Sequence, residues 1–116
     1  MRQQSYEDLI VWQKSMDLVY EVYVLTRAFP QSELYGLTSQ MRRAAVSIPS
    51  NIAEGSRRGE KEVRQFLLVA YASGAELETQ IKIAKRLQFA PDAGFVKPDG
   101  LLDEVMRMLN AMTNKT

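Results

Sequence analysis

Apolar residues recur three or four positions apart along most of this chain, which is the spacing of one face of an α-helix. The first such stripe predicts a helix over residues 8–28, which Pro30 ends because the residue before a proline is pushed out of the helical region. Its aromatic members are predicted to lie in the core or at an interface. The stripe consists of Leu9, Trp12, Met16, Val19, Tyr20 and Tyr23.

A second stripe predicts a helix over residues 33–56. Pro49 lies inside it, and a proline removes one backbone donor and crowds the preceding turn, so a kink is predicted there, with Ser50 and Asn51 close enough to satisfy loosened backbone groups. Gly55 and Gly59 are predicted to end the helix and allow the turn. The apolar members are Leu37, Met41, Ala44, Ala45, Ile48 and Ile52.

Two further helices are predicted over residues 60–89 and 98–112. Gly74 stands in the middle of the third helix at a cost of about 1 kcal/mol relative to alanine, so a close approach of a neighbouring helix or subunit is expected there. Four helices with short connections predict an all-α fold, an antiparallel up-down-up-down four-helix bundle formed by residues 1–116 as one domain. The two apolar stripes are Val63, Phe66, Ala70, Gly74, Leu77, Ile81 and Ala84, and Leu101, Leu102, Val105, Met108, Leu109 and Met112.

Composition places the chain among ordinary globular domains rather than membrane proteins. Of its 116 residues, 46% are hydrophobic and 25% are charged. The longest apolar run, Phe66–Ala72, is far shorter than the roughly 20 residues that cross a bilayer. The beginning, "MRQQSYEDLI", does not resemble a secretory signal. We therefore predict a cytoplasmic protein with no membrane partner.

The chain contains no cysteine and no histidine, and this absence removes many kinds of chemistry. Disulfides, thiolate nucleophiles, Cys/His zinc sites, the Ser-His-Asp relay and the Glu-x-x-His di-iron pattern of helical bundles all require one or the other. We predict no catalytic residue, no metal and no cofactor. The net charge of +1 provides no strong overall attraction to nucleic acid.

Polar residues form a second stripe on the predicted second helix, beside its apolar stripe. One interpretation is that Arg42 or Arg43 pairs with Glu54 or Glu76 within one bundle and fixes the register of the helices. The other places the stripe at a subunit interface, where polar groups set orientation and partner choice. A catalytic carboxylate site is the weakest interpretation, since no nucleophile or metal-ligand set accompanies it. The stripe consists of Gln40, Arg43, Ser47, Asn51 and Glu54, with Glu76 on the third helix.

Basic residues gather at the second turn and near the end of the third helix. Such charges usually form a solvated face, and cations also suit the C-terminus of a helix. Repetition around a ring of subunits would instead join the clusters into a surface that contacts phosphates. The residues are Arg57, Arg58, Lys61, Arg64, Lys82, Lys85 and Arg86.

The segment "VWQKSMDLVYEVYVLTRAFPQSELYGLTSQMRRAAVSIPSNIAEGSRRG", followed by "FLLVAYASGAELETQI", resembles the four-helix bundle family named after 23S rRNA intervening-sequence proteins. The most specific motif is "SIPSNIAEG". The resemblance implies a small bacterial bundle that assembles as a homo-oligomer, in related retroelement accessory proteins a barrel-like pentamer that binds nucleic acid. The resulting expectation is a non-catalytic interaction or scaffold subunit of a homopentamer, with RNA binding by the assembled ring as the alternative.

Overall fold

The computed structural model describes residues 5–114, and these residues form four α-helices without a strand. Residues 1–4, which begin the stretch compared above with a secretory signal, lie outside the described part, as do residues 115–116. The helices are α1 (Ile10–Thr26), α2 (Leu37–Ser56), α3 (Glu60–Arg86) and α4 (Val96–Thr113), and three short 3-10 turns are η1 (Tyr6–Asp8), η2 (Gln31–Glu33) and η3 (Asp92–Phe95). The all-α prediction is confirmed.

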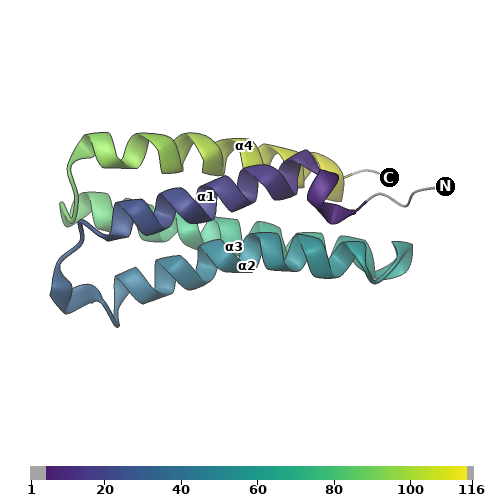
Figure 1. Ribbon diagram of the computed structural model, residues 1–116, viewed down its shortest axis with the longest axis horizontal. Coiled ribbons are helices and arrows are strands. Elements are labelled where there is room, and N and C mark those ends of the chain that lie inside the picture. Colours follow the sequence, from purple (N-terminus) through teal and green to yellow (C-terminus); the bar gives the residue numbers. More distant parts are fainter. Residues whose placement is uncertain (1–4, 115–116) are drawn as a thin grey trace.

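The helices run alternately up and down in a bundle about 49 × 26 × 23 Å in extent (Figure 1). Each helix packs against two others: α1 and α3 both contact α2 and α4. Helices α1 and α3 therefore occupy opposite corners of the bundle. Among the described residues, none of the helices combines the length and the apolar character that a membrane crossing needs. The cytoplasmic location stays a prediction.

The buried side of α1 differs from the predicted one. Leu18 and Val22 are fully buried, whereas Tyr20 of the predicted stripe is 63% exposed and Met16 is 44% exposed. Tyr23 is exposed as well. The core stripe is shifted by one residue, which turns the helix by about 100°. Leu9, Trp12 and Val19 of the predicted stripe are half-buried and pack against the core, so the prediction is right in part. It missed the centre of the buried side because exposed apolar residues lie directly beside the buried ones on this helix. Its buried residues are Val11, Ser15, Leu18, Val22, Leu25 and Thr26.

The core stripes predicted for the other three helices are largely confirmed. On α2 the five residues from Met41 to Ile52 in the stripe are buried, and Leu37 is half-buried. On α3 the stripe is buried from Ala70 onward, and Leu67 joins it. On α4 the buried members are Leu102, Val105 and Leu109.

Several helix ends differ from the predicted bounds. The second helix was predicted to start at residue 33, but residue 33 is the last residue of the 3-10 turn η2 and α2 starts at Leu37. The Glu33 carboxylate accepts a hydrogen bond from Leu37 N, 3.1 Å away. Gly55 does not end α2 but lies buried in its last turn. Gly59, with φ of 90°, makes the turn before α3, a backbone conformation that glycine adopts without strain. Helix α3 ends at Arg86, before residue 89, and α4 starts at Val96, before residue 98.

Helix α2 continues through Pro49 without a break. The Asn51 side chain donates from Nδ2 to Ser47 O at 2.8 Å. Because a proline deprives the carbonyl four residues earlier of its donor, the group that Pro49 leaves without a partner is Ala45 O. Asn51 therefore supports a neighbouring carbonyl of the same turn and not the one that Pro49 frees.

The expected close approach at Gly74 occurs within the bundle, against α4. A Cβ atom added to Gly74 would meet the thioether of Met106, with Met106 Cε at 3.3 Å. Gly74 is buried, and a side chain at this position would have to push the Met106 side chain aside. The glycine thus allows α3 and α4 to pack closely.

Replacing Gly74 with leucine is expected to destabilise the protomer by about 1–3 kcal/mol, because the larger side chain displaces Met106 and separates α3 from α4. Thermal unfolding measures the effect. The matched variant Gly74→Ala should cost less, since a methionine side chain is flexible enough to move away from one methyl group. An unchanged melting temperature for Gly74→Leu would show that the close approach does not matter.

Candidate interaction surfaces

The polar stripe of α2 faces α3 and forms a small hydrogen-bonded network with it. Ser47 Oγ and Ser73 Oγ lie 2.8 Å apart and share a hydrogen bond across the two helices. Asn51 Nδ2 also donates to Ser47 Oγ at 3.0 Å. These bonds join the middle of α2 to the middle of α3. The Ser47 and Asn51 side chains therefore find their hydrogen-bond partners within one protomer.

An open hollow of about 340 Å³ lies next to this network, between α2 and α3. It brings together four of the residues that the sequence singled out. Its walls are Gln40, Arg43, Ala44, Ser47, Ser73 and Glu76.

The ion pairs predicted inside the bundle do not form. Glu76 accepts a hydrogen bond from the Gln80 amide at 3.1 Å, and Glu54 pairs with Arg58 at 3.3 Å. Arg42 donates from Nε to Thr26 Oγ1 at 2.9 Å. Within residues 5–114, Arg43 has neither a hydrogen bond nor an ion pair. An exposed arginine without an acidic partner is thus available on this side of the bundle.

The carboxylates that a catalytic site would use are exposed. Glu54 keeps 53% of its side chain in solvent and is paired with Arg58, and Glu76 borders an open hollow. Residues 5–114 contain no group of three Asp or Glu side chains placed to hold a metal ion. Neither carboxylate is enclosed in the way that would favour proton transfer.

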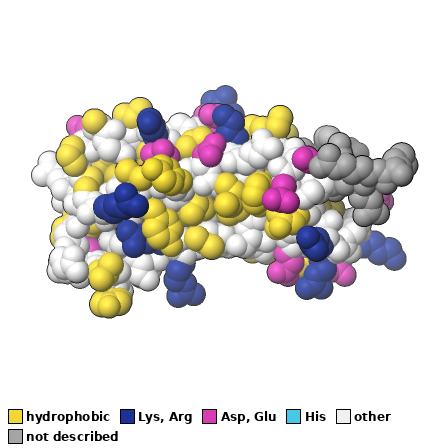
Figure 2. Space-filling model, in the orientation of Figure 1, with side chains coloured by type: hydrophobic (Ala, Val, Ile, Leu, Met, Phe, Trp, Pro, Cys, Tyr) yellow, Lys and Arg dark blue, Asp and Glu magenta, His cyan; other side chains and the backbone are white. Residues whose placement is uncertain are grey.

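A large apolar surface lies over α1 and α2. Three of its residues, Met16, Tyr20 and Tyr23, were predicted as part of the apolar stripe of the first helix. Figure 2 shows hydrophobic side chains along the middle of this face. Tyr35 is 93% exposed and Tyr20 is 63% exposed. We call this surface the α1–α2 face, and it consists of Met16, Tyr20, Tyr23 and Val46 on the two helices and of Leu34 and Tyr35 in the connection between η2 and α2.

The α1–α2 face contains two hollows. One, of about 610 Å³, lies between Tyr23, Tyr35 and Val46 and is bordered by Arg42 and Arg43. The Arg42 guanidinium sits 4.5 Å above the centre of the Tyr23 ring, a cation–π contact. The other, of about 310 Å³, is lined by residues from η1, α1 and α2, namely Tyr6, Trp12, Met16, Val19, Val46, Pro49, Ser50 and Ala53. A signal for this face existed in the sequence, because α1 carries two apolar stripes one residue apart.

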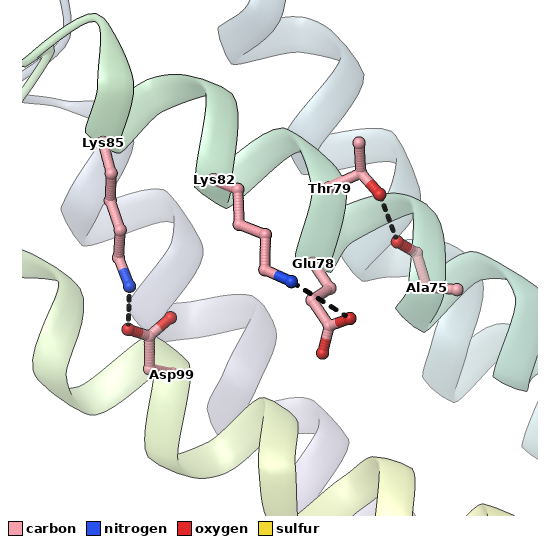
Figure 3. Close-up of polar contacts among 6 residues, drawn as sticks. All are labelled: Ala75, Glu78, Thr79, Lys82, Lys85 and Asp99. Atoms are coloured by element: carbon pink, nitrogen blue, oxygen red, sulfur yellow. Dashed lines mark hydrogen bonds and ion pairs between the residues drawn. The ribbon is translucent and has the colours of Figure 1, made fainter.

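A second uncovered apolar surface lies on α3, opposite to its core side. Thr79 is its central polar residue, and its hydroxyl donates to Ala75 O at 3.1 Å, so that polar group is satisfied by its own helix (Figure 3). Near the end of α3 the surface forms a hollow of about 320 Å³. We call this surface the α3 face, and its members, all exposed, are Leu68, Val69, Ala72, Ala75, Thr79, Ile83 and Leu87.

Three of the predicted nucleic-acid contacts are paired with carboxylates. Lys85 Nζ lies 2.6 Å from Asp99 Oδ2, and Lys82 Nζ lies 3.9 Å from Glu78 Oε1 (Figure 3). Arg58 pairs with both Glu54 and Glu62. Since each cation has an acid beside it, these residues leave little net positive charge for phosphate binding.

The remaining predicted contacts are spread along α3 and its preceding turn. Arg64 donates from Nε to Thr113 O at 2.9 Å and so holds the end of α4, and Arg57 lies over the Tyr6 ring. Lys61 and Arg86 have no ion pair within residues 5–114 and stand at opposite ends of α3. Nucleic-acid binding stays a prediction.

Comparison with known proteins agrees with this bundle and with its sequence motif. The profile of the 23S rRNA-intervening sequence protein family matches residues 7–111, nearly the whole chain. The chain belongs to this family. Among curated proteins no match is found.

A solved structure shares the fold of this 23S rRNA-intervening sequence family member. It is the crystal structure of a protein of unknown function from the S23 ribosomal protein family of Bacteroides thetaiotaomicron, determined at 1.70 Å resolution. The two chains superpose with a TM-score of 0.80 at 16% identity, over 91% of this chain and 100% of the other. At this identity the likeness establishes the fold alone.

The residues of the motif "SIPSNIAEG" in this family member mainly make packing contacts and hydrogen bonds within the bundle. Ser47 and Asn51 form the network with α3 described above. Pro49 is buried and borders the smaller of the two hollows in the α1–α2 face. Gly55 lies against Phe66, where an added Cβ atom would stand 2.8 Å from Phe66 Cβ. The motif therefore sets how closely α2 and α3 pack.

Proposed function

We propose that this protein is a non-catalytic scaffold, the subunit of a homo-oligomer in which the α1–α2 face is a subunit contact. The observation that carries the proposal is the exposure of that face, with Tyr35 at 93% and Tyr20 at 63%. Monomeric soluble proteins rarely leave a continuous apolar surface of this kind uncovered, and tyrosine is among the residues enriched at protein interfaces. A pentamer is the assembly that the family resemblance favours.

Two features favour a scaffold over nucleic-acid binding or catalysis as the first proposal. The cations Arg58, Lys82 and Lys85 are balanced by carboxylates of the same chain. The carboxylates Glu54 and Glu76 are open to solvent. RNA binding by an assembled ring is the alternative, and it needs the subunits to bring separate cations together.

The proposal is tested by the mass of the purified protein in solution, measured by light scattering after gel filtration. We expect a mass several times that of the 13.2 kDa chain. Tyr20→Glu should shift it to the protomer mass, because a charge buried at an apolar contact is costly.

The control is Val96→Glu, which places the same charge at a 68% exposed apolar residue of α4, outside the α1–α2 face. This variant should keep the wild-type mass. A wild-type protein that is monomeric at all concentrations would refute the proposed function. A Tyr20→Glu variant that assembles normally would remove the α1–α2 face from the contact.

A further inference from the structure

Polar side chains of α2 and α3 stand at matching heights where these two antiparallel helices lie side by side (Figure 1). Ser47 on α2 is level with Ser73 on α3, because their hydroxyl oxygens lie 2.8 Å apart. About one turn farther along the bundle, in the direction that runs back along α2 and forward along α3, stand Arg43 and Glu76. All four residues line the hollow of about 340 Å³, so a cation and an anion border one space that is open to solvent.

The two charges that border this hollow are not paired with each other. Arg43 has neither a hydrogen bond nor an ion pair within the described residues. Glu76 uses its Oε2 atom to accept a hydrogen bond from Gln80 Nε2 at 3.1 Å. A molecule that enters the hollow therefore meets an unpaired guanidinium group on one helix and a carboxylate with spare acceptor capacity on the other.

Gln80, directly behind Glu76, also lacks a partner. Its side chain belongs to the buried residues, with 5% exposure, and its Oε1 atom is buried without a hydrogen bond within residues 5–114. Because the nitrogen and the oxygen of an amide share one carbon atom, Oε1 lies close to the Glu76 carboxylate that Nε2 contacts. A buried acceptor without a donor is costly. An ammonium group has several N–H donors, so it can bond to Glu76 and, when that exposed side chain turns aside, to this oxygen.

The charges around the hollow select the class of ligand. A phosphate would suit Arg43 but would be repelled by Glu76, and a simple amine would suit Glu76 but would be repelled by Arg43. A small molecule that carries a carboxylate and an ammonium group satisfies both, because a carboxylate forms paired hydrogen bonds with a guanidinium group. The small side chain of Ala44 in the wall leaves room for the rest of the ligand.

We propose that the hollow between α2 and α3 binds a small zwitterion of the α-amino acid class, with the ligand carboxylate on Arg43 and the ligand ammonium group on Glu76. The amide of Gln40 lies in the same wall, where it can donate to the ligand or accept from it. Every residue of the site belongs to one chain. The site therefore adds ligand binding to the proposed scaffold and does not depend on the homo-oligomer.

Saturation-transfer NMR with the wild-type protein tests the site through probes that each carry a methyl group. L-alanine has both charges, propionate has only the carboxylate, and ethylamine has only the ammonium group. We expect L-alanine to bind with a Kd of about 1 mM, which suits a ligand of so few atoms. Propionate and ethylamine should each bind at least about tenfold more weakly, because each leaves one charge of the hollow without a partner.

Substitutions on the two helices assign the binding to this hollow. Arg43→Gln and Glu76→Gln should each weaken the binding of L-alanine at least about tenfold. Both residues are exposed, so the variants should keep the fold, which circular dichroism checks. The controls Arg86→Gln and Glu78→Gln remove the same charges from exposed positions of α3 outside the hollow and should keep the wild-type Kd.

The proposal would be overturned if L-alanine showed no saturable binding up to about 20 mM, or if a probe with a single charge bound as tightly as L-alanine. An unchanged Kd in Arg43→Gln, or an equal loss of binding in Arg86→Gln, would also overturn it. The comparison of the probes uses the wild-type protein and so does not depend on the folding of any variant. Because the solution mass decides the homo-oligomer by a separate measurement, failure of one proposal leaves the other standing.

Discussion

Leu18→Ala is expected to lower the free energy of unfolding by about 2–5 kcal/mol, one of the largest effects of a single substitution in this protein. Leu18 has no exposed surface and lies in the middle of α1 among the core residues of the bundle. The substitution removes buried methyl groups and leaves a cavity that neighbouring side chains fill only in part. Urea unfolding followed by circular dichroism measures the loss.

The matched control is Val24→Ala on the same helix. Val24 is 38% exposed and lies outside both the core and the α1–α2 face, so its truncation should change the free energy of unfolding by about 0.5 kcal/mol or less. Equal losses for the two variants would mean that Leu18 does not face the core more than Val24 does. The comparison therefore tests which side of α1 faces the core.

The buried side of α1 was predicted only in part, since Leu9, Trp12 and Val19 of the predicted stripe pack against the core but Met16, Tyr20 and Tyr23 do not. The buried stripe includes Ser15, a polar residue whose hydroxyl donates to Trp12 O at 2.8 Å and is thereby satisfied within the helix. The outer stripe carries the bulkier Tyr20 and Tyr23. Choosing the more apolar side of the helix selects the side that carries the aromatic residues. A helix with two apolar sides can bury one of them in its own core and leave the other for a second neighbour.

The core sides of α2 and α4 were predicted well because each has one dominant apolar stripe, and on α3 the predicted stripe is buried from Ala70 onward although a second apolar surface lies opposite it. On α2, Met41 and Ile48 are fully buried, as their spacing indicates, while Arg43 and Glu54 point outward. The partners of the polar residues were harder to predict. The pair between Glu54 and Arg58 follows from helical spacing, but the pair between Lys85 and Asp99 depends on how α3 meets α4, which one sequence does not specify.

Gly55→Ala is expected to destabilise the protein by about 1–3 kcal/mol, although alanine is the better helix former. The new Cβ atom would lie 2.8 Å from Phe66 Cβ and 3.4 Å from Val63 O on α3. Neither atom can move by a simple side-chain rotation, because both are part of, or directly attached to, the backbone. The two helices must therefore separate at the turn that joins them, and this loosens the packing around Ile52 and Leu67.

Gly100→Ala supplies the control for this argument. Gly100 lies in α4, is exposed, and has no atom within 4 Å of an added Cβ. Here alanine gains helix propensity without a clash, so Gly100→Ala should raise the free energy of unfolding by about 1 kcal/mol. Thermal unfolding of the two variants at equal protein concentration should give shifts of opposite sign. If both variants were stabilised, the contact of Gly55 with Phe66 would not limit the approach of α2 and α3, and the glycine of the family motif would need another explanation.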